Sequence, residues 1–277
     1  MGLKDKIIAF DIDGTLARNS SIPSLYTINE ITRLINEGYH ITLSTGRNIV
    51  SSINIYNSCN MKDLCVLCNG AMVYDPINNK KITNVTIPLN VVYELIENKE
   101  LINYIDDLLI EIDFDTYALT GNVWPNAKYI GNFKETLKNE PNAIVFFLKD
   151  AKYQENVAKI INTSKDYHYR YWFKQGEFYN LHFSKKEGME ELLKYYNKTN
   201  EDLIFFGDGE NDKELLEFAG IGVAMKNAAD DVKEVADQVS EFDNDNDGAI
   251  KHLLKMLERD LWKYFYYILA VHIIRYI

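Results

Sequence analysis

The chain has 277 residues, 47% of them hydrophobic and 26% charged, which is typical of a soluble globular protein with one large or two ordinary domains. Its 30 basic and 41 acidic residues give a net charge of −11, which argues against general affinity for nucleic acid or anionic membranes. An acidic surface also repels phosphorylated molecules at long range, so a phosphate site here would need local positive groups.

The N-terminal region and the cysteines suggest a location. The first apolar run is short and ends in acidic residues, so it does not resemble a signal peptide. Cys59, Cys65 and Cys68 are few and odd in number, which fits a reducing compartment. Cys65 and Cys68 lie on an apolar run, where side chains three residues apart on a strand point to opposite faces. We therefore expect a cytoplasmic protein with buried thiols and no metal at these cysteines.

The first predicted element is a buried strand over residues 7–10, followed directly by Asp11, Asp13 and Gly14. In an open α/β sheet, ligands bind beyond the carboxyl ends of the strands, where these acids would project. Two acids one residue apart can hold a divalent cation or divide the nucleophile and proton-transfer roles. A solvated turn after a strand has the same composition, so this stretch alone leaves both interpretations open.

The next predicted element is a helix. Thr27 and Glu30 form a capping box, and the helix should continue to about Glu37, where Gly38 ends it.

Two further predicted strands end in turns that could face the same site. Residues 40–43 precede Ser44–Arg47, where a hydroxyl, a glycine and a helix start make a good anion cradle, although a plain helix cap looks similar. Residues 64–67 precede a turn that contains Asn69. Because strands and helices alternate, we predict an α/β fold with a doubly wound parallel sheet.

Residues 85–182 have a different character. Tyr, Asn and Lys are frequent, strand-like and helical stretches alternate, and no acid-rich loop follows a strand. We predict a smaller α+β domain here, inserted into a core domain made of residues 1–84 and 183–277. Arg170, Trp172 and Lys174 could contact a substrate, but a half-buried strand with an exposed face is the interpretation that we favour.

The core domain then resumes with a helix through Leu192, and a buried strand over residues 203–206 leads into the acidic stretch Gly207–Asp212. A helix, a short strand over residues 221–225 and a helix capped by Asn227 should follow. Residues 243–248 resemble the start of a calcium-binding loop, but Leu254 stands where a bidentate glutamate is needed, so we expect only a polar loop.

The tail, residues 261–277, is apolar and aromatic. It is shorter than the roughly 20 residues that span a membrane, and it carries charges. We expect it to pack onto the core or onto a second subunit, as in a homodimer, rather than to contact a membrane.

Two loops that are far apart in the sequence thus place carboxylates at one edge of one predicted sheet. Like charges this close are unfavourable unless a cation or a proton lies between them. Mg²⁺ fits best, because it needs only one or two carboxylates together with water and phosphate. With Thr45, the N–H groups near Gly46 and one lysine as phosphate donors, the site would have the parts for phosphoryl transfer.

At this point the sequence resembles the haloacid dehalogenase (HAD) superfamily. Its four motifs resemble Asp11–Thr15, Ser44–Arg47, a lysine near position 185 and Gly207–Asp212, and Asn69–Ala71 and Gly222–Ala228 resemble the Cof-like phosphatases of that superfamily. The resemblance covers residues 7 to about 257. It implies a Rossmann-like core with an α/β cap domain inserted between the second and third motifs.

The resemblance also implies roles for single residues. Asp11 would attack phosphorus and form an aspartyl-phosphate, and Asp13 would protonate the leaving oxygen and then activate water. Mg²⁺ would be held by Asp11, the backbone carbonyl of Asp13 and Asp208, with Asn211 and Asp212 completing or supporting the shell.

The phosphate-binding residues implied by the resemblance are Thr45, Gly46, Asn69 and Lys185. Relatives often have Lys-Gly at the third motif, whereas this chain has Lys185-Lys186-Glu187-Gly188. The position of the following helix favours Lys185 as the motif lysine over Lys186.

We therefore expect a Mg²⁺-dependent phosphatase of small phosphorylated metabolites, with sugar phosphates first among them. P-type ATPases resemble the first motif but have Thr two residues after the nucleophile, so Asp13 favours rapid hydrolysis. One alternative is a phosphomutase of the phosphomannomutase type. Another is a catalytically idle, phosphate-binding regulatory protein.

Overall fold

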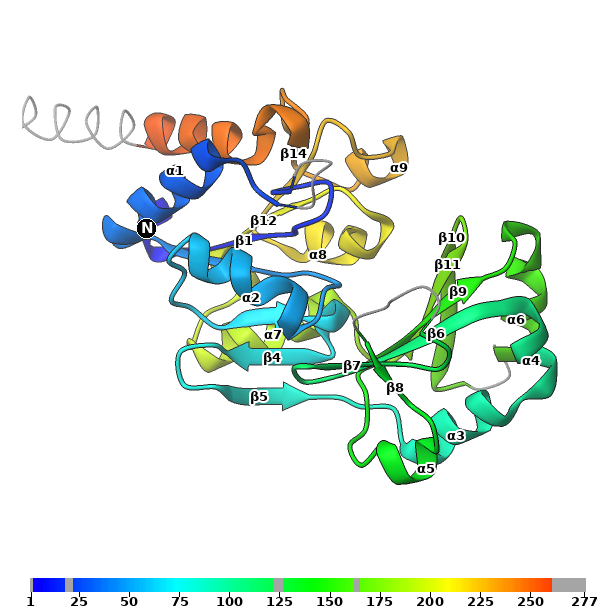
Figure 1. The fold of residues 1–277 in the computed structure, drawn as a ribbon. Helices are drawn as coiled ribbons and strands as arrows, with labels where there is room; N and C mark the ends of the chain where they lie inside the picture. The colour runs from blue at the N-terminus through cyan, green and yellow to red at the C-terminus, as the bar shows by residue number, and fades with distance from the viewer. Residues whose placement is uncertain (1, 18–21, 122–126, 162–164, 261–277) are drawn as a thin grey trace, which may run out of the picture.

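The computed structural model describes residues 2–17, 22–121, 127–161 and 165–260, which form two parts side by side (Figure 1). The first part is built on a five-stranded parallel sheet with the order β14-β13-β12-β1-β2. Its strands are β1 (Ile7–Phe10), β2 (His40–Leu43), β12 (Leu203–Gly207), β13 (Ile221–Ala224) and β14 (Gln238–Val239). The predicted α/β class with a parallel-sheet core is confirmed.

Helices cover both faces of this sheet (Figure 1). They are α1 (Leu25–Asn36), α2 (Ile49–Ser58), α7 (Lys185–Tyr195), α8 (Lys213–Phe218) and α9 (Asp230–Lys233), and residues 248–260 are also helical. Ile8 and Phe10 of β1 belong to an apolar cluster with residues of α1 and α2. Ile7 and Ala9 belong to a second cluster, with residues of α7 and α8. Because successive side chains of a strand point to opposite faces, a continuously apolar strand requires this cover on both sides.

Helix α1 begins at Leu25, earlier than predicted. The N-cap is Ser24, whose hydroxyl accepts a hydrogen bond from the backbone N–H of Thr27 at 3.1 Å. The predicted cap at Thr27 is therefore wrong. The Thr27 hydroxyl instead donates to Asp247 at 3.0 Å, a contact between distant segments that local sequence does not reveal.

The predicted strand at residues 64–67 forms as β3 (Cys65–Leu67), but in a different sheet. It pairs antiparallel with β4 (Met72–Asp75), which pairs with β5 (Lys80–Asn84). A single parallel bridge between Ser44 and Val66 connects it to the end of β2. Cys65 is buried and Cys68 half-buried, and burial raises the pKa of both thiols, so neither is activated.

The second part has its own sheet and its own apolar interior. The six strands, in the order β10-β11-β9-β6-β7-β8, are β6 (Ile105–Ile112), β7 (Asp115–Ala118), β8 (Lys128–Tyr129), β9 (Ala143–Leu148), β10 (Tyr167–Trp172) and β11 (Gln175–Asn180). The helices are α3 (Leu89–Glu97), α4 (Lys99–Tyr104), α5 (Phe133–Thr136) and α6 (Gln154–Ile161). All members of its apolar cluster lie between residues 87 and 178. We propose, with the boundaries that the sequence predicts, that residues 85–182 are the cap domain and that the other described residues form the core domain.

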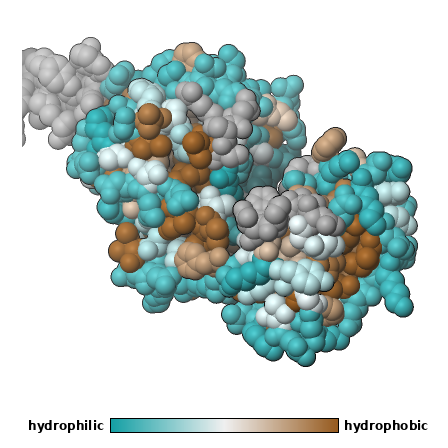
Figure 2. Space-filling view, viewed as in Figure 1, coloured by the Kyte–Doolittle hydropathy of each residue, from teal (hydrophilic) through white to brown (hydrophobic). Residues whose placement is uncertain are grey.

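The surface and the tail complete the description. Figure 2 shows hydrophilic residues over most of one face, with apolar residues in separate groups on both domains. Within the described residues, no helix has the length and apolar character needed to cross a bilayer. The tail at 261–277, on which the expectation of a homodimer rested, lies outside the described residues.

Candidate active site

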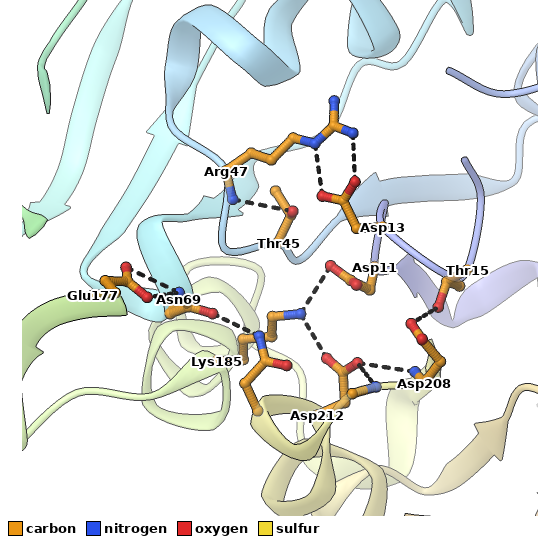
Figure 3. Close-up of polar contacts among 12 residues, drawn as sticks. Asp11, Asp13, Thr15, Thr45, Arg47, Asn69, Glu177, Lys185, Asp208 and Asp212 are labelled. Carbon is orange, nitrogen blue, oxygen red and sulfur yellow. Dashed lines mark hydrogen bonds and ion pairs between the residues drawn. The ribbon is translucent and has the colours of Figure 1, made fainter. Parts of the chain in front are cut away.

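The candidate site lies where the strands β1, β2 and β12 end (Figure 3). Strands β1 and β12 are neighbours in parallel register, with Phe10 opposite Phe206. Asp11 follows β1, and its backbone N–H donates to the carbonyl of Phe206 at 2.9 Å. Asp208 follows β12 directly. The topology thus brings together two acids that are far apart in the sequence, as the arrangement of parallel strands predicts.

Three carboxylates form one cluster. Oxygen atoms of Asp11, Asp208 and Asp212 all lie within 4.8 Å of one another, and no other such group of metal-binding side chains occurs among the described residues. The orientation of Asp212 is fixed, because one of its oxygens accepts the backbone N–H groups of Asp208 and Gly209, each at 2.9 Å. Gly14, at φ +75°, allows the close approach of the first loop, since a Cβ there would lie 2.0 Å from Asp208 Oδ2.

Lys185 lies between two of these acids. Its ammonium is 2.8 Å from Asp11 Oδ1 and 2.6 Å from Asp212 Oδ1, and its side chain is fully buried. The residue begins α7, whose N-cap Ser184 forms a capping box with Glu187. Gly70 packs tightly against this turn, because a Cβ on it would lie 1.8 Å from the Ser184 carbonyl oxygen. Lys186 instead forms an ion pair with Glu190 at 3.0 Å on the surface.

The electrostatics of the cluster favour an additional cation. Burial, opposed by Lys185, raises the pKa of Asp11 to about 7, and Asp212 contributes to the rise. Burial, with a contribution from Asp212, raises the pKa of Asp208 to about 6. Although burial opposes it, the charges of Asp11 and Asp212 raise the pKa of Lys185. Three clustered carboxylates with one ammonium beside two of them leave an excess of negative charge, and carboxylate oxygens are the ligands that Mg²⁺ prefers. The donor set therefore fits this ion.

Asp13 lies apart from the cluster. Its two carboxylate oxygens accept from Nε and Nη2 of Arg47, at 2.8 and 2.6 Å, and 60% of its side chain is exposed. A bidentate pair of this kind fixes the orientation of the carboxylate. The side chain of Asp13 therefore lies apart from the acid cluster, and only its backbone carbonyl was expected to bind the metal.

The turn that was predicted as an anion cradle follows β2, and α2 begins only at Ile49, with Asn48 as its N-cap. Thr45 is buried, and its hydroxyl accepts the backbone N–H of Arg47 at 3.2 Å. Gly46 is in contact with Asn69, since a Cβ on Gly46 would lie 2.9 Å from Asn69 Nδ2. A side chain at position 46 would thus occupy the space beside the cradle.

Asn69 and Asn211 contact each other. Asn211 Nδ2 donates to Asn69 Oδ1 at 2.8 Å, so the amide nitrogen of Asn211 faces Asn69. Asn69 Nδ2 donates to both carboxylate oxygens of Glu177, at 3.2 and 3.3 Å. Glu177 belongs to β11 of the cap domain and was not predicted as a site residue (Figure 3).

Two further residues at this edge were missed or misassigned. The Thr15 hydroxyl donates to Asp208 Oδ1 at 3.0 Å. Asn227 Nδ2 donates to the carbonyl of Gly14 at 2.9 Å, and Asn227 Oδ1 accepts the backbone N–H of Asn244. The predicted cap at Asn227 is wrong, because α9 begins at Asp230 with Ala229 as its N-cap. The only sequence signal was that both residues lie in stretches that resemble family motifs.

Comparison with known protein sequences finds one family. The sequence model of the haloacid dehalogenase-like hydrolases matches residues 8–253. The 5-amino-6-(5-phospho-D-ribitylamino)uracil phosphatase YitU of Bacillus subtilis is 30% identical over 270 residues, which cover 91% of this chain and 98% of that protein. The pyridoxal phosphate phosphatase YbhA of Escherichia coli is 26% identical, over 84% of this chain and 92% of that protein.

Solved structures share the fold. A haloacid dehalogenase-like hydrolase from Bacteroides thetaiotaomicron superimposes with a TM-score of 0.82 at 22% identity, covering 91% of this chain and 100% of that one. One from B. subtilis superimposes with a TM-score of 0.74 at 26% identity, covering 90% of this chain and 99% of that one.

Proposed function

This chain belongs to the haloacid dehalogenase-like hydrolases, and from that membership we propose that it is a Mg²⁺-dependent phosphatase of small phosphorylated metabolites, with sugar phosphates first among them. That it is a phosphatase of this family is established by the comparisons, and the metal and the substrate class are the proposal. The observation that carries it is the cluster of Asp11, Asp208 and Asp212, two of which, Asp11 and Asp212, bind the buried ammonium of Lys185.

The metal would be held by the three carboxylates of this cluster, together with the backbone carbonyl of Asp13 and support from Asn211. When bound, Mg²⁺ supplies positive charge to the oxygens of the phosphoryl group. Its positive charge would also oppose the effect of burial, and of the Asp212 charge, which together raise the pKa values of Asp11 and Asp208. Both acids would then be ionised near neutral pH, as a nucleophile and a ligand must be.

Asp11 would act as the nucleophile. Its oxygen attacks phosphorus, a new O–P bond forms on Asp11, and the bond from phosphorus to the leaving oxygen breaks. Lys185 holds Asp11 Oδ1 at 2.8 Å, so the carboxylate enters the reaction already oriented. Thr45 and the backbone N–H of Gly46 would bind the oxygens of the phosphoryl group, and Lys185 would offset their charge. Asn69, which was also expected to bind phosphate, donates to Glu177 in this structure.

Asp13 would move the proton. In the first step it gives its proton to the leaving oxygen, and in the second its carboxylate takes a proton from the water that attacks the aspartyl-phosphate. The proton that Asp13 takes from water in the second step replaces the one that it gave in the first, so each turnover restores its starting form. The first step requires Asp13 to move away from Arg47, which binds both of its carboxylate oxygens in this structure.

The substrate class follows from the relatives by analogy. YitU is named for a phosphorylated ribityl compound and YbhA for pyridoxal phosphate, both small phosphoric monoesters. Phosphatases that share this chain's length and fold thus act on phosphorylated metabolites, which supports the same class here.

The test is phosphate release from p-nitrophenyl phosphate and from a panel of phosphorylated metabolites, with and without Mg²⁺. We expect turnover with Mg²⁺, none with EDTA, and none for Asp11→Asn. Normal turnover in EDTA, or by this variant, would refute the mechanism. Turnover that requires a hexose 1,6-bisphosphate and isomerises the sugar, without free phosphate, would show a mutase instead.

A further inference from the structure

Two carboxylates of the cap domain contact asparagines of the core domain. Glu177 of β11 accepts the side-chain amide of Asn69, and Glu111 of β6 is hydrogen-bonded to the side chain of Asn48. Both asparagines belong to the active-site edge: Asn48 is the N-cap of α2, next to Arg47, and Asn69 touches Gly46. The proposed function gives Glu177 and Glu111 no role.

Glu177 is the more firmly held of the two. Its side chain is only 8% exposed, and Arg170 of β10 donates to its Oε2 from Nε at 2.8 Å and from Nη2. Arg170 in turn lies over the ring of Tyr179, 4.7 Å from its centroid. The cap domain therefore presents one buried, oriented carboxylate to the core domain at Asn69.

The carboxylate of Glu177 fixes the direction of the hydrogen bonds that lead from it to Asn69 and Asn211. A carboxylate can only accept, so Asn69 must turn its amide nitrogen to Glu177 and its oxygen to the other side. That oxygen then requires a donor, which is Asn211 Nδ2 at 2.8 Å. The oxygen of Asn211 is consequently turned toward Gly209, because a Cβ on Gly209 would lie 2.5 Å from Asn211 Oδ1.

This series of hydrogen bonds ends at the loop Gly207–Asp212, the proposed magnesium-binding loop. Gly209 lies between Asp208 and the segment η5 (Glu210–Asp212), which carries Asp212. The backbone N–H of Gly209 also donates to Asp212 Oδ2 at 2.9 Å. A change in the orientation of the Asn211 amide would therefore place an N–H donor, instead of an oxygen, beside a loop that holds two of the three clustered acids.

We propose that Glu177 is a positioning residue, which orients Asn69 and through it Asn211 when the cap domain is seated, so that the Asn211 oxygen faces the magnesium-binding loop. This inference rests on the proposed function, since it assigns a cap residue to the same metal site. It makes the affinity for the metal depend on a residue of the other domain. Outer-shell partners of a metal ligand typically contribute a factor of about 10–100 to affinity.

The test compares Glu177→Ala with Glu155→Ala, an exposed glutamate on α6 of the same domain. Mg²⁺ affinity is measured by calorimetry without substrate, together with kcat and KM for p-nitrophenyl phosphate and the melting temperature. We expect Glu177→Ala to bind Mg²⁺ about tenfold more weakly, with a larger change in kcat than in KM. Glu155→Ala should match the unaltered protein. Unchanged Mg²⁺ affinity in folded Glu177→Ala, whatever its melting temperature, would overturn the proposal.

A second pair of variants keeps the question open to refutation if Glu177→Ala does not fold. Asn69→Asp places a second carboxylate against Glu177 and should weaken Mg²⁺ binding. Adding Glu177→Gln restores one donor and one acceptor with the roles exchanged, and Asn211 can still donate to position 69. The double variant should regain most of the Mg²⁺ affinity. A double variant no better than Asn69→Asp alone would overturn the proposal.

Failure of the proposed function has a different signature. If the unaltered protein binds no Mg²⁺ and releases no phosphate, the function itself is wrong. If it does both, and position 177 changes neither Mg²⁺ affinity nor kcat, only the positioning role is wrong.

Discussion

The pH dependence of stability in the metal-free protein tests whether the acid cluster is a cation site. Asp11 and Asp208 have pKa values of about 7 and about 6 in the folded protein, against 3.8 for an ordinary aspartate. Between these values the folded state binds more protons than the unfolded state. The free energy of unfolding must therefore fall as pH rises, the opposite of the behaviour of a carboxylate stabilised by a salt bridge.

The size of the effect follows from the two pKa values. Between pH 5 and pH 8, Asp208 contributes a loss of about 1.4 kcal/mol and Asp11 about 2.6 kcal/mol, at about 1.4 kcal/mol for each unit of pKa. The total of about 4 kcal/mol corresponds to a fall of roughly 8–16 °C in melting temperature for a protein of this size. It is a large part of the 5–15 kcal/mol that typically separates folded from unfolded states.

The assay is denaturation by urea at pH 5, 6, 7 and 8, with EDTA in one series and saturating Mg²⁺ in the other. With the metal bound, both acids stay ionised, so their contribution to the pH dependence should vanish. The gap between the two series should widen by about 4 kcal/mol from pH 5 to pH 8. Asp208→Asn, which keeps an oxygen for the Thr15 hydroxyl, should remove the smaller part of the loss in EDTA.

Two results would refute this reasoning. If stability in EDTA stays constant or rises over the range, burial does not raise the pKa values of Asp11 and Asp208 in the folded protein. If Mg²⁺ stabilises the protein equally at pH 5 and pH 8, it does not bind at the ionised forms of these residues.

Three other predictions follow from single contacts. Lys185→Met leaves Asp11 without its cation and should lower the free energy of unfolding by about 3–5 kcal/mol, measured by urea denaturation in EDTA. Lys186→Met, which removes a surface ion pair, should have little effect. Equal losses in the two variants would contradict the assignment of Lys185 as the buried lysine. Asp13→Asn should lower kcat/KM by about 10²–10⁴-fold for an alkyl phosphate, because the leaving alkoxide needs a proton. The rate of the first turnover of p-nitrophenyl phosphate should fall much less, because its leaving group needs none. Equal losses for the two substrates would show that Asp13 is not the general acid. Burial and, to a smaller extent, the charge of Glu177 raise the pKa of Glu111 to about 7. The free energy of unfolding should therefore fall by roughly 2–3 kcal/mol from pH 5 to pH 8 because of this residue. Thermal unfolding of Glu111→Gln with saturating Mg²⁺ should not show this fall.

The sequence predicts those parts of the site that depend on strand order. The apolar run at residues 7–10 is the strand β1 with the same bounds, and residues 203–206 fall in β12. Asp11 and Asp208 follow strands that must run parallel in such a fold, so their side chains meet at one edge whatever the loops do in detail. Such patterns are local, and the topology that joins them is shared by the whole fold class.

The sequence does not predict contacts that depend on side-chain orientation between distant segments. Ser24, and not Thr27, caps α1, because the Thr27 hydroxyl has Asp247 as a partner. Asn227 looks like a helix cap, yet it donates to the carbonyl of Gly14. Glu177 lies in a β-strand of the other domain, with no motif around it. In each case the choice among hydrogen-bond partners is made by three-dimensional packing, which no local pattern records.

The separate apolar interior of residues 87–178 has an evolutionary consequence. Because its described members belong to neither apolar cluster of the core domain, substitutions inside it can change the cap domain without repacking the strands that carry Asp11 and Asp208. The sequence of the cap domain can thus change during evolution while the acid cluster of the core domain is kept. Such changes would be limited at the few contacts between the two domains, among them those of Asn48 and Asn69.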